Sequence, residues 1–211
     1  MVMSSNRKNF ASRRHANAWN RAWIAALFCC AAVTADAWVL TVTPGARTVY
    51  LGVGNSTTNA ANATINLVSV TVPSNVVGTG ASQAMTSNST QANSPFDGFT
   101  VCTPPNQVYI GGYFREPSTT ANVASLQVNT PANLSNGVET IPFSQISWTS
   151  TALGNAAADI PAGTFNGANL FLRNFASNTY VENCHTFSYA NTNVVAAGVY
   201  NGRATYTLTS P

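Results

Sequence analysis

The C-terminal segment of this chain alternates between small or apolar residues and polar ones. Residues 198–211 read Gly-Val-Tyr-Asn-Gly-Arg-Ala-Thr-Tyr-Thr-Leu-Thr-Ser-Pro. Successive side chains of a β-strand point to opposite faces, so Tyr200, Tyr206 and Leu208 share one face and the threonines share the other. Such a strand buries one face against a sheet. It therefore favours a β-sandwich and raises the question of strand exchange between subunits.

Short segments of the same kind, separated by turn residues, continue along the chain, and helical periodicity is nearly absent. Turns such as Pro44-Gly45 and Asn166-Gly167 separate them. The predicted strands are 39–43, 48–53, 63–72, 99–103, 107–114, 122–129, 143–149, 169–175, 179–189 and 199–209. Many short strands at fairly even spacing predict an all-β sandwich or barrel rather than βαβ units.

A stretch rich in Gly, Ser, Thr and Asn, residues 77–96, has few apolar residues. We expect a long surface loop there. Loops of this length are uncommon in compact domains unless they are mobile or functional. A disordered excursion is the favoured interpretation, and the alternative is that this loop and residues 130–137 bind a ligand.

The N-terminal segment 1–37 has the organisation of a cleaved secretory signal peptide. Five basic residues precede a short apolar core at 22–33, and Ala35-Asp36-Ala37 matches a small-x-small cleavage site. The core of about a dozen residues is shorter than the roughly 20 that a membrane-spanning helix needs. We therefore expect an exported protein with one domain, residues 38–211, and no stable membrane span after cleavage.

Removal of this segment changes the charge of the chain. The whole sequence has a net charge of +3, but the predicted mature part has four arginines, no lysine and five acidic residues, a net charge of −1. A protein that binds a phosphate backbone needs several Lys or Arg side chains to release counterions. Nucleic acid is therefore not an expected partner.

The predicted mature chain keeps two cysteines, Cys102 and Cys184. Outside the cytosol such a pair predicts a disulfide. In chain-entropy models, a disulfide that closes a loop of roughly 80 residues stabilises the folded state by on the order of 4 kcal/mol. A thiol activated by the neighbouring His185 is disfavoured, because adjacent residues of a strand point to opposite faces.

No motif indicates an enzyme, a metal centre or a cofactor. His185 is the only histidine after residue 37, no Gly-x-Ser-x-Gly is present, and we expect a structural or surface role for this histidine. The acidic residues lie far apart and form no calcium-loop motif. They are Asp97, Glu116, Glu139, Asp159 and Glu182. A pair of them acting as a hydrolase remains our remote alternative.

The favoured interpretation of the charged residues is ion pairing on the sheet surface. Glu116 stands beside Arg115, and Glu182 is expected near Arg173 or Arg203.

Aromatic side chains are the candidates for ligand binding. Tyr109, Tyr113, Phe114 and Trp148 would stack on a sugar if the protein is an adhesin or a carbohydrate-binding module. For Trp148, packing in the core is the favoured interpretation. Its spacing from the cysteines differs from that of true immunoglobulin domains.

Three segments together resemble a group of uncharacterised exported proteins of Gram-negative bacteria. These segments are 70–80, 141–149, and 186–191 with 197–208. The ending Gly-x-Tyr-x-Gly-x-Ala-x-Tyr-x-Leu is also similar to the last strand of spore-coat-U-like and chaperone–usher pilus subunits. The resemblance implies an immunoglobulin-like antiparallel β-sandwich and a structural role in the periplasm, on the outer surface or outside the cell.

We therefore expect a secreted or surface-associated structural protein, a pilus- or coat-like subunit, with the adhesin as the alternative. Its partners would be other copies of itself or a periplasmic chaperone, and a glycan or surface ligand for the adhesin. In donor-strand assembly, a strand of alternating side chains is added to another subunit's sheet. Trp38, Leu40 and Val42 have that pattern. The favoured alternative is that residues 38–43 form the first strand of their own sheet.

Overall fold

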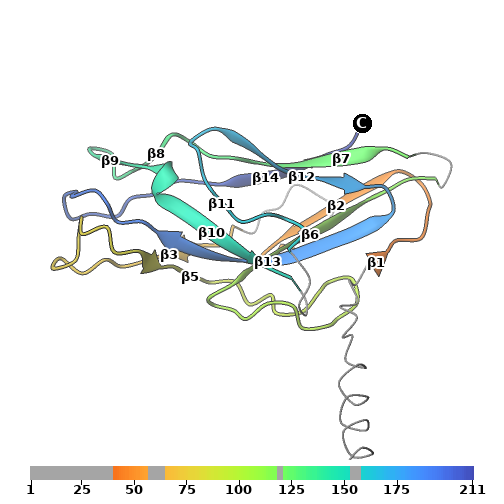
Figure 1. Ribbon diagram of the computed structural model, residues 1–211, viewed down its shortest axis with the longest axis horizontal. Coiled ribbons are helices and arrows are strands. Elements are labelled where there is room, and N and C mark those ends of the chain that lie inside the picture. Colours follow the sequence, from red (N-terminus) through yellow and green to blue (C-terminus); the bar gives the residue numbers. More distant parts are fainter. Residues whose placement is uncertain (1–39, 57–64, 118–120, 153–157) are drawn as a thin grey trace, which may run out of the picture. The chain divides into compact units, whose positions relative to one another are not determined.

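The structure is a computed structural model that describes residues 40–56, 65–117, 121–152 and 158–211 (Figure 1). These residues belong to one compact unit, 37–211. The predicted signal peptide and Trp38 lie outside the described residues. Within the described ranges, no helix is long and apolar enough to cross a membrane.

The described residues form an all-β fold in which the paired strands are antiparallel. The strands are β1 (Leu40–Thr41), β2 (Thr48–Val53), β3 (Val68–Ser69), β4 (Gln83–Ala84), β5 (Thr86–Ser87), β6 (Val108–Arg115), β7 (Val123–Asn129), β8 (Asn133–Ser135), β9 (Thr140–Pro142), β10 (Ile146–Thr151), β11 (Gly163–Thr164), β12 (Asn169–Ala176), β13 (Thr179–Tyr189) and β14 (Thr205–Thr209). One 3-10 turn, η1 (Phe143–Gln145), precedes β10.

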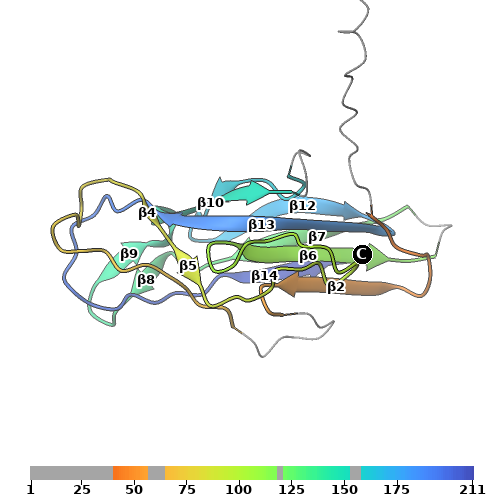
Figure 2. The ribbon, with the colours of Figure 1, turned by 90° about the horizontal axis from the view of Figure 1, so that it is seen from below.

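Two sheets enclose the main core in a sandwich-like arrangement (Figures 1 and 2). The larger sheet has the order β11-β10-β13-β6-β2, with β1 and β4 also paired to β13, and the smaller sheet has the order β12-β7-β14. Alternate residues of each strand supply the core, as on β7, where Ala124, Leu126 and Val128 are fully buried. Ile110 and Phe114 meet them from β6 of the larger sheet.

Most long predicted strands are confirmed. The bounds of β2 and β13 are as predicted. β6 is shifted by one residue, β7 begins one residue later than predicted, and β12 ends one residue later. In the segment 199–209 only Thr205–Thr209 pairs as a strand, although exposed and half-buried side chains alternate as expected.

Two predicted strands are wrong. In 99–103 only Thr100 forms an isolated bridge, with Asn93. In the described part of 63–72 only Val68–Ser69 pairs as a strand. The backbone of Leu67 is bonded instead to Asn88, which lies 21 residues further along the chain. The Leu67 N–H donates to the Asn88 side chain, and the Leu67 carbonyl accepts from the Asn88 N–H.

The predicted loop 77–96 has more structure than a disordered excursion. It includes β4 and β5, and Met85 between them is buried in the main core. Its later part lies against the outer face of the larger sheet, where the candidate site is found.

Candidate functional site

A row of tyrosines crosses the outer face of the larger sheet. The register of β2, β6 and β13 places Tyr50 beside Tyr113 and Tyr113 beside Tyr180. The rings of Tyr50 and Tyr113 are stacked with centroids 5.5 Å apart, and Phe96 stacks on Tyr180 at 4.5 Å. Val42 packs on this row, in which Tyr50 and Tyr180 are buried and Tyr113 is half-buried.

The next row of the same face, two residues along each strand, contains two glycines and a glutamate. Gly52 pairs with Gly111, and Gly111 pairs with Glu182. The fully buried Tyr109 extends its hydroxyl over Gly111, and a Cβ atom on that glycine would lie 2.2 Å from the Tyr109 Oη. The glycines thus leave space beside Glu182 for tyrosine hydroxyls.

The hydroxyls form a hydrogen-bonded chain that ends on the carboxyl group. The Tyr109 hydroxyl donates to Glu182 Oε2 at 3.0 Å, and its oxygen lies 2.6 Å from the Tyr180 Oη. Because the Tyr109 proton is directed to Glu182, the Tyr180 hydroxyl is the donor of the second bond. Among the described residues, the buried atoms Glu182 Oε1 and Tyr50 Oη have no hydrogen bond of good geometry.

Burial raises the pKa of Glu182 above its usual range. The hydroxyls of Ser94 and Tyr109 favour the charged form, whereas the nearby negative charge of Asp97 disfavours it further. Burial likewise raises the pKa of Tyr109 and of Tyr180. The site therefore combines a carboxyl group that resists ionisation with phenol groups that remain neutral.

A disulfide holds the segment that covers this cluster, residues 88–107, which we call the cover loop. Cys102 is bonded to Cys184 with a Cα–Cα distance of 5.5 Å, so the predicted disulfide is confirmed. Cys184 lies two residues after Glu182, on the same face of β13, and both cysteines pack on Tyr109. In Figure 2 the loop lies in front of β6.

The structure places only part of the predicted aromatic set near the surface. Phe114 is 0% exposed and Trp148 is 3% exposed, so a sugar-stacking role for these two is wrong in this structure. Trp148 packs on Phe165 and donates its Nε1–H to the Pro161 carbonyl at 2.9 Å, which confirms the core interpretation. Tyr109 is buried too, which leaves Tyr113 as the accessible member.

The two terminal segments belong to the fold of their own chain. Leu40 pairs with Tyr180 of β13, and Val42 is buried, as expected for the first strand of its own sheet. Tyr200, Tyr206 and Leu208 are partly buried against the main core, as their alternation predicts. Among the described strands, β14 pairs only with β7 and is the edge of the smaller sheet.

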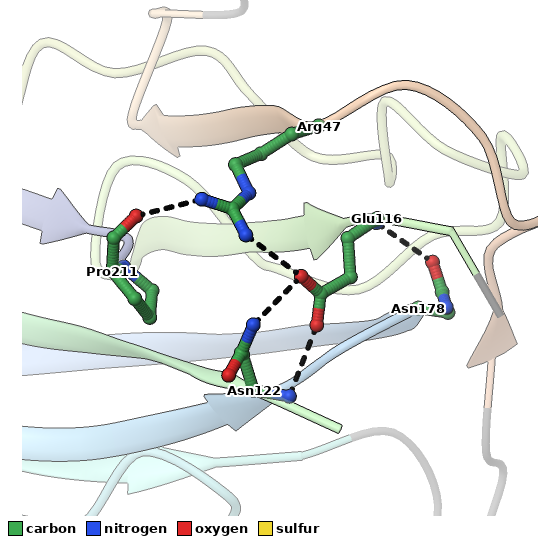
Figure 3. A network of polar contacts seen from close by, with 5 residues as sticks. All are labelled: Arg47, Glu116, Asn122, Asn178 and Pro211. Carbon is green, nitrogen blue, oxygen red and sulfur yellow. Dashed lines mark hydrogen bonds and ion pairs between the residues drawn. The ribbon is translucent and has the colours of Figure 1, made fainter. Parts of the chain in front are cut away.

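The predicted ion pair between Glu116 and Arg115 is wrong, because Glu116 contacts Arg47 at 3.4 Å (Figure 3). Asn122 donates to both Glu116 oxygens, from its backbone at 3.0 Å and from its side chain at 3.1 Å. Burial alone would raise the pKa of Glu116, but these bonds and the Arg47 charge lower it overall. Arg47 also donates to the Pro211 main-chain oxygen at 3.0 Å.

Glu182 has no arginine partner among the described residues, so its predicted ion pair is wrong as well. Arg173 pairs with Asp159 instead.

His185 is buried in the core, which confirms its structural role and corrects the surface alternative. Its ring stacks on Trp148 with centroids 5.7 Å apart, and neither ring nitrogen has a hydrogen-bond partner among the described residues. Burial lowers the pKa of His185 to about 3.

The described residues contain no group of three or more His, Cys, Asp or Glu that would hold a metal ion. The tyrosine and carboxyl cluster escaped the sequence analysis, although a signal for it existed. Tyr-x-Gly occurs at 50–52 and again at 109–111. On a strand, this spacing places an aromatic ring next to a gap on the same face.

Comparison with known proteins finds no match. No protein-family model, no curated protein and no solved structure matches this chain.

Proposed function

We propose that this is an exported structural protein with an immunoglobulin-like β-sandwich domain, a coat- or pilus-like subunit that joins copies of itself through its sheet edges. The observation that carries the proposal is the position of β2 and β14. These strands lie side by side, one at an edge of each sheet (Figure 2). Within the described residues, each has a strand neighbour on one side only.

An edge strand presents unpaired N–H and C=O groups, which can pair with a strand of another chain. Proteins that avoid such pairing place lysine, proline or a bulge in their edge strands. β14 reads Thr-Tyr-Thr-Leu-Thr and β2 reads Thr-Val-Tyr-Leu-Gly-Val, so neither strand has a charged residue or a proline.

The disulfide supports the extracytoplasmic part of the proposal. Cys102–Cys184 is a bond that persists in oxidising compartments. The resemblance of the last strand to coat and pilus subunits indicates the kind of assembly, with a periplasmic chaperone as a partner before assembly.

The test is the oligomeric state of the exported protein over a range of concentrations, measured by light scattering after gel filtration. Thr207→Lys introduces a charge on the exposed side of β14, and Thr149→Lys does the same at an exposed position of β10, which is paired on both sides. We expect oligomers for the unmodified protein and for T149K, and monomers for T207K. A monomeric unmodified protein, or equal assembly of both variants, would contradict the proposal.

A second function, glycan binding, is favoured by the aromatic groups that stay accessible beside the cover loop. Phe96 is 40% exposed and stacks on the tyrosine row that includes Tyr113. Aromatic faces of this kind bind sugars through their apolar side. A glycan array should then give hits that are lost in Phe96→Ala and kept in Phe171→Ala, an exposed phenylalanine on β12 of the smaller sheet. Absence of hits, or equal loss in both variants, counts against this function.

A further inference from the structure

The segment 65–72 has the side-chain pattern of a strand, although only its β3 part pairs with a neighbour. Every second side chain, including those of Val68 and Val70, packs against the main core. The alternate row is exposed, and it begins with Ile65 at 61% and Leu67 at 59% exposure. The segment therefore has one face on the core and one apolar face in water.

The hydrogen bonds of β3 show in which direction its backbone groups point. The Leu67 N–H donates to the Asn88 side chain at 2.8 Å, and the Leu67 carbonyl accepts from the Asn88 N–H at 3.0 Å. Two residues further along, Ser69 pairs with Thr86 of β5. Backbone groups of successive residues in an antiparallel strand point to opposite sides. Those of Val68 and of Val70 therefore point away from β5.

The backbone of β5 has the same alternation on its other side. Met85 and Ser87 flank the paired Thr86, and their N–H groups donate away from β3, to the Phe187 carbonyl at 3.0 Å and to the Pro105 carbonyl at 2.8 Å. These bonds join β5 to β13 and to the cover loop, so β3 is the outermost strand there. Within the described ranges, no hydrogen bond engages the backbone of Val68 on its outward side or the backbone of Val70.

The sequence of this edge is open to the addition of a strand. Residues 65–72 read Ile-Asn-Leu-Val-Ser-Val-Thr-Val, whereas protected edges contain charged residues or proline. The neighbouring edge strand β2 is less open. It lies beside β14 of its own chain, and its last carbonyl, that of Val53, accepts from the Asn66 side chain at 2.9 Å and from the Ser56 N–H at 3.1 Å.

Each copy of the protein thus presents two different open edges, β14 of the smaller sheet and the segment 65–72. A contact between two like edges would pair one kind and leave the other kind unpaired. A contact between unlike edges uses both kinds in one interface. We propose that β14 of one copy pairs with residues 65–72 of the next copy, which we call the acceptor edge, and that its threonine side chains cover Ile65 and Leu67.

This contact joins two different surfaces, so it is head-to-tail. Repetition of such a contact produces a ring or an open filament rather than a closed dimer. The inference rests on the proposed function, because it names the edge that receives β14 when copies assemble.

The experiment combines one variant of each edge. Ser69→Lys places a charge at an exposed position in the middle of the acceptor edge. We expect S69K alone to be monomeric, as T207K is, at concentrations at which the unmodified protein and T149K assemble. A mixture of S69K and T207K should then form dimers with one copy of each variant and nothing larger, because β14 is intact in S69K and the acceptor edge is intact in T207K. Light scattering after gel filtration measures the masses.

Assembly of S69K like the unmodified protein, while T207K is monomeric, overturns the contact and leaves the proposed function standing. A mixture that stays monomeric also overturns it, because like edges would then be the ones that meet. Assembly of T207K, or a monomeric unmodified protein, contradicts the proposed function and this inference with it. Thr71→Lys, at another exposed position of the acceptor edge, replaces S69K if that variant does not fold.

Discussion

The Tyr109 hydroxyl occupies the space that a side chain at Gly111 would fill, since a Cβ atom there would lie 2.2 Å from Tyr109 Oη. The same position would lie 2.8 Å from the Cβ of Glu182. A glycine on the middle strand of the cluster is therefore what allows the hydroxyl to reach the carboxyl group. A side chain at position 111 would therefore collide with Tyr109 and Glu182.

Gly111→Ala should destabilise the protein by roughly 1–3 kcal/mol, the usual cost of overpacking a filled interior. Tyr109→Phe in the same chain should restore part of this loss, because it removes the closest atom. Denaturant unfolding measures both. Gly45→Ala is the control, since its Cβ would lie 3.6 Å from Arg115, an ordinary contact. Equal stability of the two alanine variants would contradict the close approach.

Loss of the Cys102–Cys184 disulfide should lower the free energy of unfolding by about 4 kcal/mol, because the bond closes a long loop of the unfolded chain. The double variant C102S/C184S, unfolded in denaturant, measures the effect. Reductant should destabilise the unmodified protein by a similar amount and leave the double variant unchanged. A reductant effect on the double variant would show that the loss has another source.

His185 should make the protein less stable in mild acid. Its pKa is about 3 in the folded chain and ordinarily 6.5, so between these values the unfolded chain binds the extra proton. The free energy of unfolding that depends on neutral His185 is constant above pH 6.5 and is lost progressively as the pH falls toward 3. Unfolding free energies measured from pH 7.5 to 4 should show this slope.

His185→Phe should flatten that slope and raise the stability at neutral pH by about 1 kcal/mol or more. It keeps an aromatic ring against Trp148 and removes two ring nitrogens that have no hydrogen-bond partner in the described chain. An unchanged pH slope in this variant would assign the acid sensitivity to other groups.

Glu116→Gln should loosen the start of β7. The Glu116 carboxylate accepts from the backbone and side chain of Asn122, and a neutral amide accepts more weakly and offers one oxygen. Hydrogen exchange at the Asn122 amide should become faster. Protonation of Glu116 should have the same effect, and because its pKa is lowered, this requires a pH below the usual pKa range of a glutamate. Glu139→Gln, which changes an acid bonded to Ala196 and Tyr200, should leave this amide unchanged.

Alternation of side chains and flanking turn residues predicted the strand positions wherever a long alternating segment also pairs with neighbouring strands. This holds for β2 and β13, whose bounds were predicted from alternation and flanking turns. The prediction failed at 63–72. The described residues of this segment alternate, but the Leu67 N–H donates to the Asn88 side chain instead of to a neighbouring strand. A side chain distant in sequence competes there with the sheet, and alternation does not reveal such competition.

The sequence by itself determined which residues share a face of each strand and which cysteines are paired. These properties depend on the geometry of a single strand and on having two cysteines beyond residue 37. Only the tertiary structure decided that Glu116 meets Arg47 and that the Tyr109 hydroxyl donates to Glu182. The physical reason is that strand register and loop packing set those distances, and both arise from contacts between segments far apart along the chain.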